Sequence, residues 1–258
     1  MKKIAYLLIL VFSVQAAAAQ IVKSRSEPAF KVGEQLNYKL RYGFITAAEA
    51  TLQVLDTDVK FDNKPTFHLV ANGRTAGTFD FFYKVRNRYD SYIDKEDLTP
   101  YLYSEDIREA SYRRSDKVRF YQDQQKIVGR KGTFKGKAQT FDLVSAYYFA
   151  RNLDMSGVHP GKKITLYYFL DDEVADLQIE YIGKERVKTS MGYFNCLKFS
   201  PAIQPGRVFR KDSRLYLWIT DDGNRIPVKA QVEILVGSVT MELVSAKNLK
   251  YPLNVSKK

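Results

Sequence analysis

The chain has 258 residues, of which 45% are hydrophobic and 14% aromatic, and it carries a formal net charge of +12 at pH 7. This length and composition permit a substantial hydrophobic core, in one large domain or two smaller ones. Cys196 is the only cysteine, so the sequence excludes a fold stabilised by internal disulfides.

The N-terminus has the three parts of a secretory signal peptide. Lys2 and Lys3 precede an apolar stretch at 4–14, and residues 16–19 are alanines. We predict cleavage after residue 19, which lowers the net charge to +10, and export to the periplasm or beyond. The apolar stretch is shorter than the roughly 20 residues that a membrane-spanning helix needs. No cysteine stands at the cut, so we do not expect a lipoprotein, and no later segment is apolar enough to span a membrane.

Residues 20–29 have little periodicity and predict a flexible leader, with the ordered domain starting near Phe30. Beyond it, Leu36, Tyr38, Leu40 and Tyr42 alternate with other residues, which is typical of a strand that is half buried. Residues 51–55 and 67–71 predict further strands. Residues 80–141 predict a series of β-hairpins, with one face packed on the core and the other exposed to solvent.

One segment has the period of a helix instead of a strand. Its apolar positions are Leu143, Ala146, Tyr147, Ala150 and Leu153. They share one face of a helix, and Asp142 is well placed as its N-cap. We therefore expect a helix over about 142–153. Asp142, Ser145 and Tyr148 are expected either to hydrogen-bond into the sheet or to line a ligand site.

The second half returns to strands, expected at 164–170, 177–181, 194–199, 215–220, 227–235 and 238–244. Asp222 and Gly223 form a strong hairpin signal between two of them. The sequence thus predicts a mainly β protein, an antiparallel curved sheet or barrel-like domain with one central inserted helix. The domain is expected over 30–250, as one unit or as two β halves of similar size joined by the helix, followed by a tail at 251–258.

Few residues suggest catalysis. His68 and His159 have no neighbours at ligand spacing, and Cys196 has no companion, so we expect no metal site. Ser145 is not in a nucleophile elbow, and no glycine-rich phosphate loop is present, so we expect no cofactor and name no catalytic residue. The acidic runs at 171–173 and 221–222 fall at predicted turns, where Asp is favoured for local hydrogen bonds. These observations lean against an enzyme.

Cations interleaved with aromatic residues are the more informative pattern, because they suit an anionic or sugar-bearing ligand. The candidate ligand-binding residues are Tyr83, Arg86, Arg88, Tyr112, Arg114, Arg119 and Tyr148. The alternative is a solvated strand face whose charges discourage edge pairing. A nucleic acid is not an expected partner, because an exported protein is separated from the nucleic acids of the cell and the sequence has no recognised nucleic-acid-binding motif.

The order of short motifs along the chain resembles a known bacterial family. The motifs are Val32-Gly33-Glu34, Leu36-Asn37-Tyr38, Tyr42-Gly43, 142–148 with Arg151, Gly183-Lys184-Glu185, Gly192 with Phe194-Asn195-Cys196, Leu217 to Asp222, Ile226-Pro227-Val228 and Gly237-Ser238. Together, from about Phe30 to Leu249, they resemble the family known as domain of unknown function 3108, in the style of a Bacteroidota member. The resemblance implies an exported, mostly β domain in the envelope of Gram-negative bacteria, and it carries no catalytic residues over.

Three functions stay open on the sequence. The first is a non-catalytic periplasmic envelope protein that binds an amphipathic, lipid-like or glycan-bearing anionic ligand, such as lipopolysaccharide, or an envelope protein partner. The second is a hydrolase acting on envelope glycan or lipid. The third is a purely structural interaction module.

Overall fold

The computed structural model describes residues 23–202, 214–234 and 237–256. The predicted signal peptide at 1–19 lies outside these ranges. The first half of the chain contains β1 (Gln35–Tyr42), β2 (Ile45–Leu55), β3 (Lys60–Phe61), β4 (Lys64–Thr75), α1 (Gly77–Phe82), β5 (Arg86–Asp94), β6 (Pro100–Glu109), β7 (Tyr112–Tyr121), the 3-10 turn η1 (Gln122–Gln124), β8 (Lys126–Gly129) and β9 (Gly132–Lys135). The second half contains β10 (Thr140–Phe141), α2 (Leu143–Arg151), β11 (Lys163–Leu170), β12 (Glu173–Thr189), β13 (Gly192–Pro201), β14 (Leu215–Thr220), β15 (Pro227–Glu233) and β16 (Ser238–Lys247).

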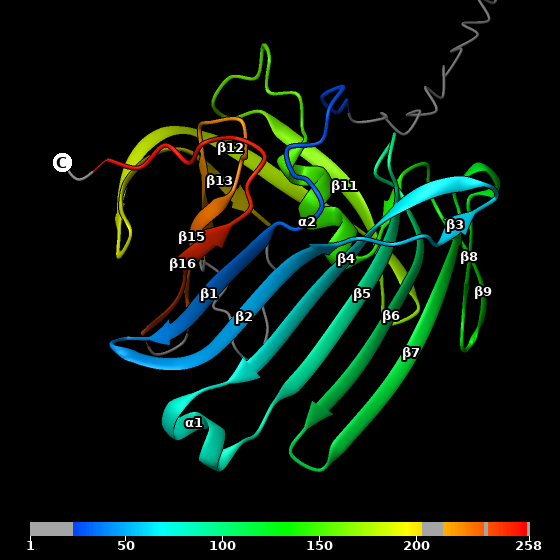
Figure 1. Ribbon diagram of the computed structural model, residues 1–258, viewed down its shortest axis with the longest axis horizontal. Coiled ribbons are helices and arrows are strands. Elements are labelled where there is room, and N and C mark those ends of the chain that lie inside the picture. Colours follow the sequence, from blue (N-terminus) through cyan, green and yellow to red (C-terminus); the bar gives the residue numbers. More distant parts are fainter. Residues whose placement is uncertain (1–22, 203–213, 235–236, 257–258) are drawn as a thin grey trace, which may run out of the picture.

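The strands form one long, strongly curved sheet (Figure 1). Its order is β10-β11-β12-β13-β14-β15-β16-β1-β2-β4-β5-β6-β7-β8-β9, with β3 paired to β4 beside this path. The pairs are antiparallel except β10 with β11. The last strand, β16, pairs with the first, β1, and this seam joins the two halves. The ends of the order, β9 and β10, are not neighbours, so the sheet stays open, and the predicted mainly β, barrel-like class is confirmed.

Side-chain alternation decides which face of the sheet is packed. In β4, Phe67, Leu69 and Ala71 pack in or against the main core, whereas Asn72 and Arg74, further along the strand, lie on the opposite face. Neighbouring strands keep this pattern because their pairing is in register across β2, β4 and β5. One face of the first half is therefore apolar, and the other is polar.

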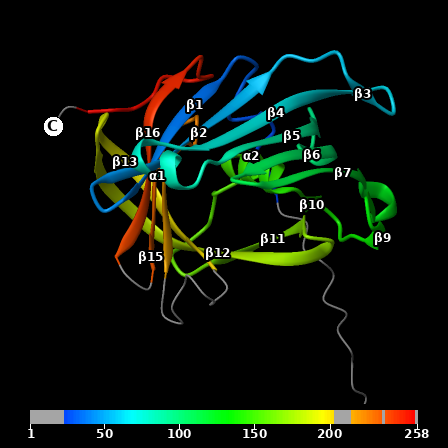
Figure 2. The ribbon, with the colours of Figure 1, turned by 90° about the horizontal axis from the view of Figure 1, so that it is seen from below.

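The curvature folds the sheet over the central helix. Figure 2 shows α2 between a layer containing β4 to β7 and a layer containing β11 and β12. The main core draws side chains from both layers and from the helix, including Leu69, Ile93, Phe149 and Leu166. A second cluster, which includes Leu36, Tyr38, Trp218 and Leu243, packs near the seam. Within the described ranges, neither helix is long and apolar enough to cross a lipid bilayer.

The N-terminus of α2 is closed by a capping box. The Asp142 carboxylate accepts hydrogen bonds from the backbone N–H groups of Val144 (2.8 Å) and Ser145 (2.9 Å), and the Ser145 hydroxyl accepts from the Asp142 N–H. The second carboxylate oxygen accepts from the Ser91 hydroxyl in β5 at 2.7 Å. Burial raises the pKa of the Asp142 carboxyl, although these donors oppose the rise. The cap therefore also ties the helix to the sheet.

The helix is packed on more sides than the predicted apolar stripe suggests. Leu143, which belongs to that stripe, is exposed, whereas Val144, Tyr148 and Phe149 lie off the stripe and are buried. A helix enclosed by two layers of sheet buries residues around most of its circumference. A single-face pattern could not reveal this enclosure.

Two further expectations are corrected by the structure. The predicted flexible leader is packed over its described part: the Arg25 N–H donates to the Asn152 carbonyl at 2.8 Å, and the Ala29 N–H donates to Asn152 Oδ1 at 2.6 Å. The second correction concerns helices: besides the predicted helix α2, the structure has a short helix α1, which overlaps the start of the hairpins expected at 80–141. Its six residues are too few to show a helical period.

A buried ion pair links the end of α2 to the start of β1. Arg151 Nη1 and Nη2 donate to the two Glu34 oxygens at 2.5 and 2.9 Å, and both side chains are at most 1% exposed. Arg151 also donates to the Asn224 carbonyl in the β14–β15 turn, at 3.0 Å from Nη2. Burial opposes the charge on Arg151, but the Glu34 carboxylate outweighs it and raises the Arg151 pKa.

We expect Asp142→Ala to lower the free energy of unfolding by about 2 kcal/mol, the upper end of the range for helix caps. The value is high because the Ser91 hydroxyl also loses its acceptor. Asp58→Ala, at an exposed position, is the control and should change stability by less than about 0.5 kcal/mol. Urea unfolding measures both, and equal values for the two variants would contradict the capping role.

We expect Glu34→Gln to cost about 3–5 kcal/mol, because it leaves the Arg151 charge buried without its counter-charge. The double variant Glu34→Leu/Arg151→Met removes both charges and should recover most of that loss. Urea unfolding of the two variants gives the comparison. A double variant as unstable as the single one would show that the pair acts through shape and not charge.

Candidate functional site

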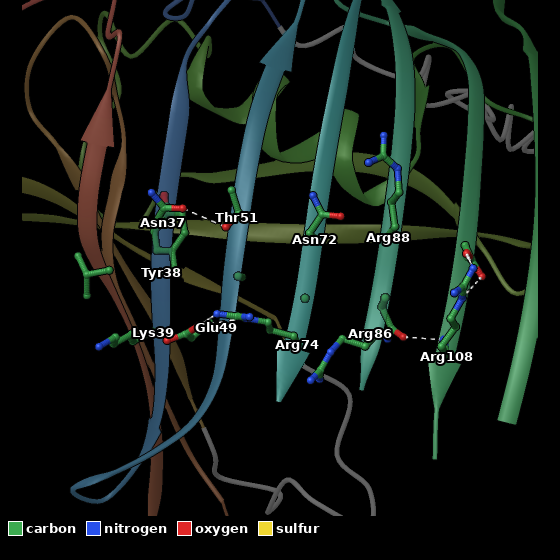
Figure 3. Close-up of a pocket in the computed structure, with 15 residues that line it drawn as sticks. Asn37, Tyr38, Lys39, Glu49, Thr51, Asn72, Arg74, Arg86, Arg88 and Arg108 are labelled. Carbon is green, nitrogen blue, oxygen red and sulfur yellow. Dashed lines mark hydrogen bonds and ion pairs between the residues drawn. The ribbon is translucent and has the colours of Figure 1, made fainter. Parts of the chain in front are cut away.

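A polar groove with a volume of about 580 Å³ runs across β1, β2, β4, β5 and β6. Figure 3 shows its side chains in front of these strands, with α2 behind them. The lining residues are Asn37, Tyr38, Lys39, Glu49, Ala50, Thr51, Asn72, Gly73, Arg74, Arg86, Asn87, Arg88, Asp106, Arg108 and Val244. The groove therefore lies on the face of the sheet turned away from the main core.

Strand register aligns these side chains into rows. One row runs Asn37, Thr51, Asn72, Arg88 and Asp106, each directly opposite the next on the adjacent strand. Such opposite residues have their Cβ atoms about 5 Å apart and share one face. At one end of the row, the Thr51 hydroxyl donates to Asn37 Oδ1 at 3.0 Å, and Asn37 Nδ2 donates to the Ser245 hydroxyl at 2.7 Å. The row is thus a continuous line of amides, a hydroxyl and charges.

A second row lies one step closer to the strand ends. It runs Lys39, Glu49, Arg74 and Arg86 on the same four strands, β1, β2, β4 and β5. Together with Arg88 and Arg108, the lining has five cationic side chains and two carboxylates, those of Glu49 and Asp106. The groove is therefore positively charged.

Three of the four groove arginines are each held by a carboxylate along the Nε–Nη2 edge of the guanidinium. Arg74, Arg88 and Arg108 donate through Nε and Nη2, to Glu49 at 3.1 and 2.6 Å, to Asp90 at 2.8 and 2.7 Å, and to Asp106 at 3.3 and 2.7 Å. None of the three has a hydrogen bond from Nη1 to another described residue. A guanidinium has five N–H groups, so each of these arginines is oriented by its carboxylate and retains donors for a further acceptor.

The fourth groove arginine is bound differently. Arg86 donates through Nη1 and Nη2 to the two oxygens of Asp80 at 2.6 and 2.9 Å. This contact raises the pKa of Arg86 and lowers that of Asp80, which also accepts a hydrogen bond from Thr75. Asp90 and Asp106 likewise raise the pKa values of Arg88 and Arg108. Arg86, Arg88 and Arg108 are therefore oriented by carboxylates and keep their positive charge across the physiological pH range.

The structure brings together only two of the seven ligand-binding residues predicted from the sequence. Arg86 and Arg88 line the groove. Tyr83 follows α1, and Tyr112 begins β7 at the β6–β7 turn, both exposed to solvent. Tyr148 is fully buried against Phe30 in the main core, and its hydroxyl has no hydrogen-bond partner among the described residues.

The remaining two predicted arginines make contacts within the fold. Arg114 forms ion pairs with Glu105 at 2.8 Å and with Asp171 at 3.0 Å. Arg119 stacks on aromatic rings, with its guanidinium carbon 4.5 Å from the centroid of Phe61, and donates to the Tyr101 carbonyl at 2.7 Å. These contacts account for both arginines as structural residues.

Sequence reasoning missed most of the groove lining, including Asn37, Thr51, Asn72 and Arg74. They occupy the polar positions of alternating strands, which usually face water and carry no signal of their own. The register of β1, β2 and β4 is the missing information, because it aligns the four residues on one face.

The described residues offer little for catalysis or metal binding. They contain no group of three or more His, Cys, Asp or Glu side chains placed to hold a metal ion. Burial raises the pKa of the Cys196 thiol to about 12, which removes its nucleophilic form near neutral pH. In the acidic runs, Asp171 pairs with Arg114, Asp172 pairs with Lys131 at 2.7 Å, and Asp221 pairs with Lys184 at 2.7 Å.

Residues 37–244 match the family model described as protein of unknown function DUF3108. The chain belongs to the DUF3108 family. The match spans the strands from β1 to β16, including α2 and the whole groove. No curated protein matches the chain in the sequence comparison.

Three solved structures are similar to this chain to different degrees. A beta-barrel-like protein of the DUF1849 family from Brucella abortus matches with a TM-score of 0.55 at 10% identity, over 87% of the DUF3108 chain and 99% of its own. A candidate exported protein with a YmcC-like fold from Bacteroides fragilis matches with a TM-score of 0.40 at 13% identity, over 88% and 100% of the two chains. A candidate lipoprotein from Parabacteroides distasonis matches with a TM-score of 0.39 at 12% identity, over 86% and 100%. The Brucella structure supports the beta-barrel-like fold of this chain.

Arg119→Ala should lower the free energy of unfolding by about 1–2 kcal/mol, because it removes a cation stacked on aromatic rings and the apolar stem that packs there. The matched control is Arg113→Ala at the exposed start of β7, which should change stability by less than about 0.5 kcal/mol. Thermal and urea unfolding measure both. A neutral Arg119→Ala would return this residue to the set of candidate ligand-binding side chains.

Proposed function

We propose that this DUF3108 domain is a non-catalytic binding protein of the cell envelope whose groove holds an anionic, sugar-bearing ligand. The observation that carries the proposal is the set of three groove arginines, Arg74, Arg88 and Arg108, each fixed along one edge and retaining Nη1 donors. Side chains oriented before binding lose less conformational entropy when a ligand arrives.

The chemistry of the lining suits both parts of such a ligand. Guanidinium groups bind phosphate and carboxylate oxygens through charge-assisted hydrogen bonds. The amides of Asn37, Asn72 and Asn87 offer both donors and acceptors, which sugar hydroxyl groups need. A volume of about 580 Å³ lies within the range of small-molecule sites, which is about 300–1,000 Å³.

The alternatives have less support from the described residues. A lipid-like ligand inside the sheet would compete with the side chains of the main core, which fill the space around α2. A glycan hydrolase needs two carboxyl groups facing a sugar across the cleft. The two carboxylates of the lining, Glu49 and Asp106, are instead bound to Arg74 and Arg108.

The location of the protein is part of the proposal. Its support is the N-terminal sequence, in which Lys2 and Lys3, an apolar stretch and four alanines have the order of a cleavable signal. Phosphorylated and acidic sugars are components of bacterial envelopes, so an exported groove of this charge would meet suitable ligands in the periplasm.

Isothermal titration of the exported form with sugar phosphates and uronic-acid oligosaccharides tests the proposal, with neutral oligosaccharides of the same length as the comparison. Arg88→Gln should weaken binding about tenfold or more, because a hydrogen bond to a charged group contributes about 1.5–3 kcal/mol. Lys117→Gln on β7 makes the same charge change outside the groove lining and should bind like the parent. Failure of every acidic ligand to bind would overturn the proposal and favour a structural interaction module.

A further inference from the structure

Large apolar side chains stand exposed at one end of the sheet. Phe44, in the β1–β2 turn, is 94% exposed, and Phe81 and Phe82, at the end of α1, are 87% and 77% exposed. Ile45, Phe79 and Tyr83 are exposed beside them in the chain. We call these six residues the aromatic edge. Soluble proteins rarely leave several phenylalanines together in water, so a patch of this kind points to an interaction surface.

The two parts of the aromatic edge lie side by side. The Ala76 N–H, just before α1, donates to the Ala47 carbonyl near the start of β2 at 3.0 Å, and a Cβ on Gly77 would lie 3.5 Å from the Thr46 carbonyl. Figure 1 shows α1 beyond the end of β4, close to the β1–β2 turn. The exposed rings of both segments therefore gather at the same end of the sheet.

The exposure of α1 is built into the fold. The helix has no buried residue of its own, and its position is fixed by Asp80, which accepts hydrogen bonds from Thr75 at 2.7 Å and from Arg86 at 2.6 and 2.9 Å. The Val85 N–H donates to the Thr75 hydroxyl at 2.9 Å and secures the chain after the helix. These polar contacts hold α1 in an orientation that leaves Phe81 and Phe82 in solvent.

Three cationic residues lie at the same end of the sheet as these rings. Arg41 precedes the β1–β2 turn, and Lys84 follows α1. The Ala110 N–H donates to the Lys84 carbonyl at 2.8 Å, which brings the β6–β7 turn, and Arg113 at the start of β7, to the same end. The acidic residue of α1, Asp80, is neutralised by Arg86. Exposed rings with cations near them are complementary to an anionic lipid surface, where the rings enter the boundary of the acyl chains and the cations meet the headgroups.

We propose that the aromatic edge docks this domain on the surface of a bilayer containing anionic phospholipid. Phe44, Phe81 and Phe82 insert below the headgroups, and Arg41, Lys84 and Arg113 contact the lipid phosphates. The side chains come from separate turns and project from the strand ends, which suits a fluid surface that adapts to them. This inference rests on a different surface from the groove and does not depend on the proposed ligand.

Vesicle co-sedimentation tests the proposal, using the chain from Gln20 onward because the apolar N-terminal segment would itself bind lipid. The protein should sediment with vesicles of phosphatidylcholine mixed with phosphatidylglycerol, bind phosphatidylcholine alone at least about tenfold more weakly, and detach as salt is added. Phe81→Ser/Phe82→Ser should reduce binding to the anionic vesicles about tenfold or more. Arg41→Gln/Lys84→Gln should reduce it by a similar factor and remove most of the salt dependence.

The control variant is Val59→Ser/Leu143→Ser, which removes two exposed apolar side chains, 42% and 47% exposed, outside the aromatic edge and should bind like the parent. Circular dichroism melting curves that match the parent establish that each variant is folded. Arg88→Gln should keep vesicle binding even where it abolishes sugar binding, which separates this proposal from the previous one. Equal binding to neutral vesicles, an unaffected Phe81→Ser/Phe82→Ser, or a parent dimer that this variant makes monomeric would each overturn the proposal.

Discussion

The arrangement of this domain depends on the junction where α2 meets the start of β1 and the β14–β15 turn, and the buried ion pair between Arg151 and Glu34 lies at that junction. Two opposite charges removed from water are stable only if each satisfies the other and their remaining hydrogen-bonding groups also find partners. Arg151 meets this condition by reaching the Glu34 carboxylate and the Asn224 carbonyl. It thereby fixes the last turn of α2 against the beginning of β1 and the turn between β14 and β15, which belong to both halves of the sheet.

Other contacts reinforce this junction. The Tyr38 and Tyr147 hydroxyls are 3.0 Å apart and link β1 to α2 a second time. At the other end of the helix, Asp142 reaches Ser91 in β5. The helix is consequently held at both ends by polar bonds and along its length by apolar packing. The groove lies on the opposite face of the same strands that pack against α2. Because packing on that side fixes how these strands pair, it also fixes how the groove residues align.

Much of the fold follows from local sequence patterns. Alternation predicts the strands because each has one packed face. Asp142 identifies the start of α2 because its carboxylate accepts hydrogen bonds from the first backbone N–H groups of the helix. The turn after β14 was likewise readable: Asp222 Oδ1 accepts hydrogen bonds from the backbone N–H groups of Asn224 and Arg225 at 2.9 and 3.2 Å. Arg151 illustrates the limit. A cation in the last turn of a helix usually faces water, and only the tertiary structure shows that its partner, Glu34, lies far away in the sequence.

The candidate site was less accessible to sequence reasoning, because its members lie on separate strands and align only through pairing. Arg86 and Arg88 stood out as cations near tyrosines, but Asn72 and Thr51 have no distinguishing local pattern. Arg119 and Arg114 show the reverse case, in which a cation near aromatic or acidic residues serves the fold itself. Arg88 differs from these two in its Nη1, which has no hydrogen bond to a described residue, whereas Nη1 donates to Asp171 in Arg114 and to the Tyr101 carbonyl in Arg119.

The seam between β1 and β16 has a consequence for how the protein matures. Most strands pair with their neighbours in sequence, so hairpins in each half can form early, whereas Gln35 opposite Lys247 joins the two ends of the domain. Pairing between distant segments forms slowly, because a long loop must close first. A chain that folds while it emerges from its N-terminus would present β1 with an open edge until β16 has emerged. The final strand would therefore act as the closing step of folding, and a chain interrupted before residue 238 would expose a strand edge that invites aggregation.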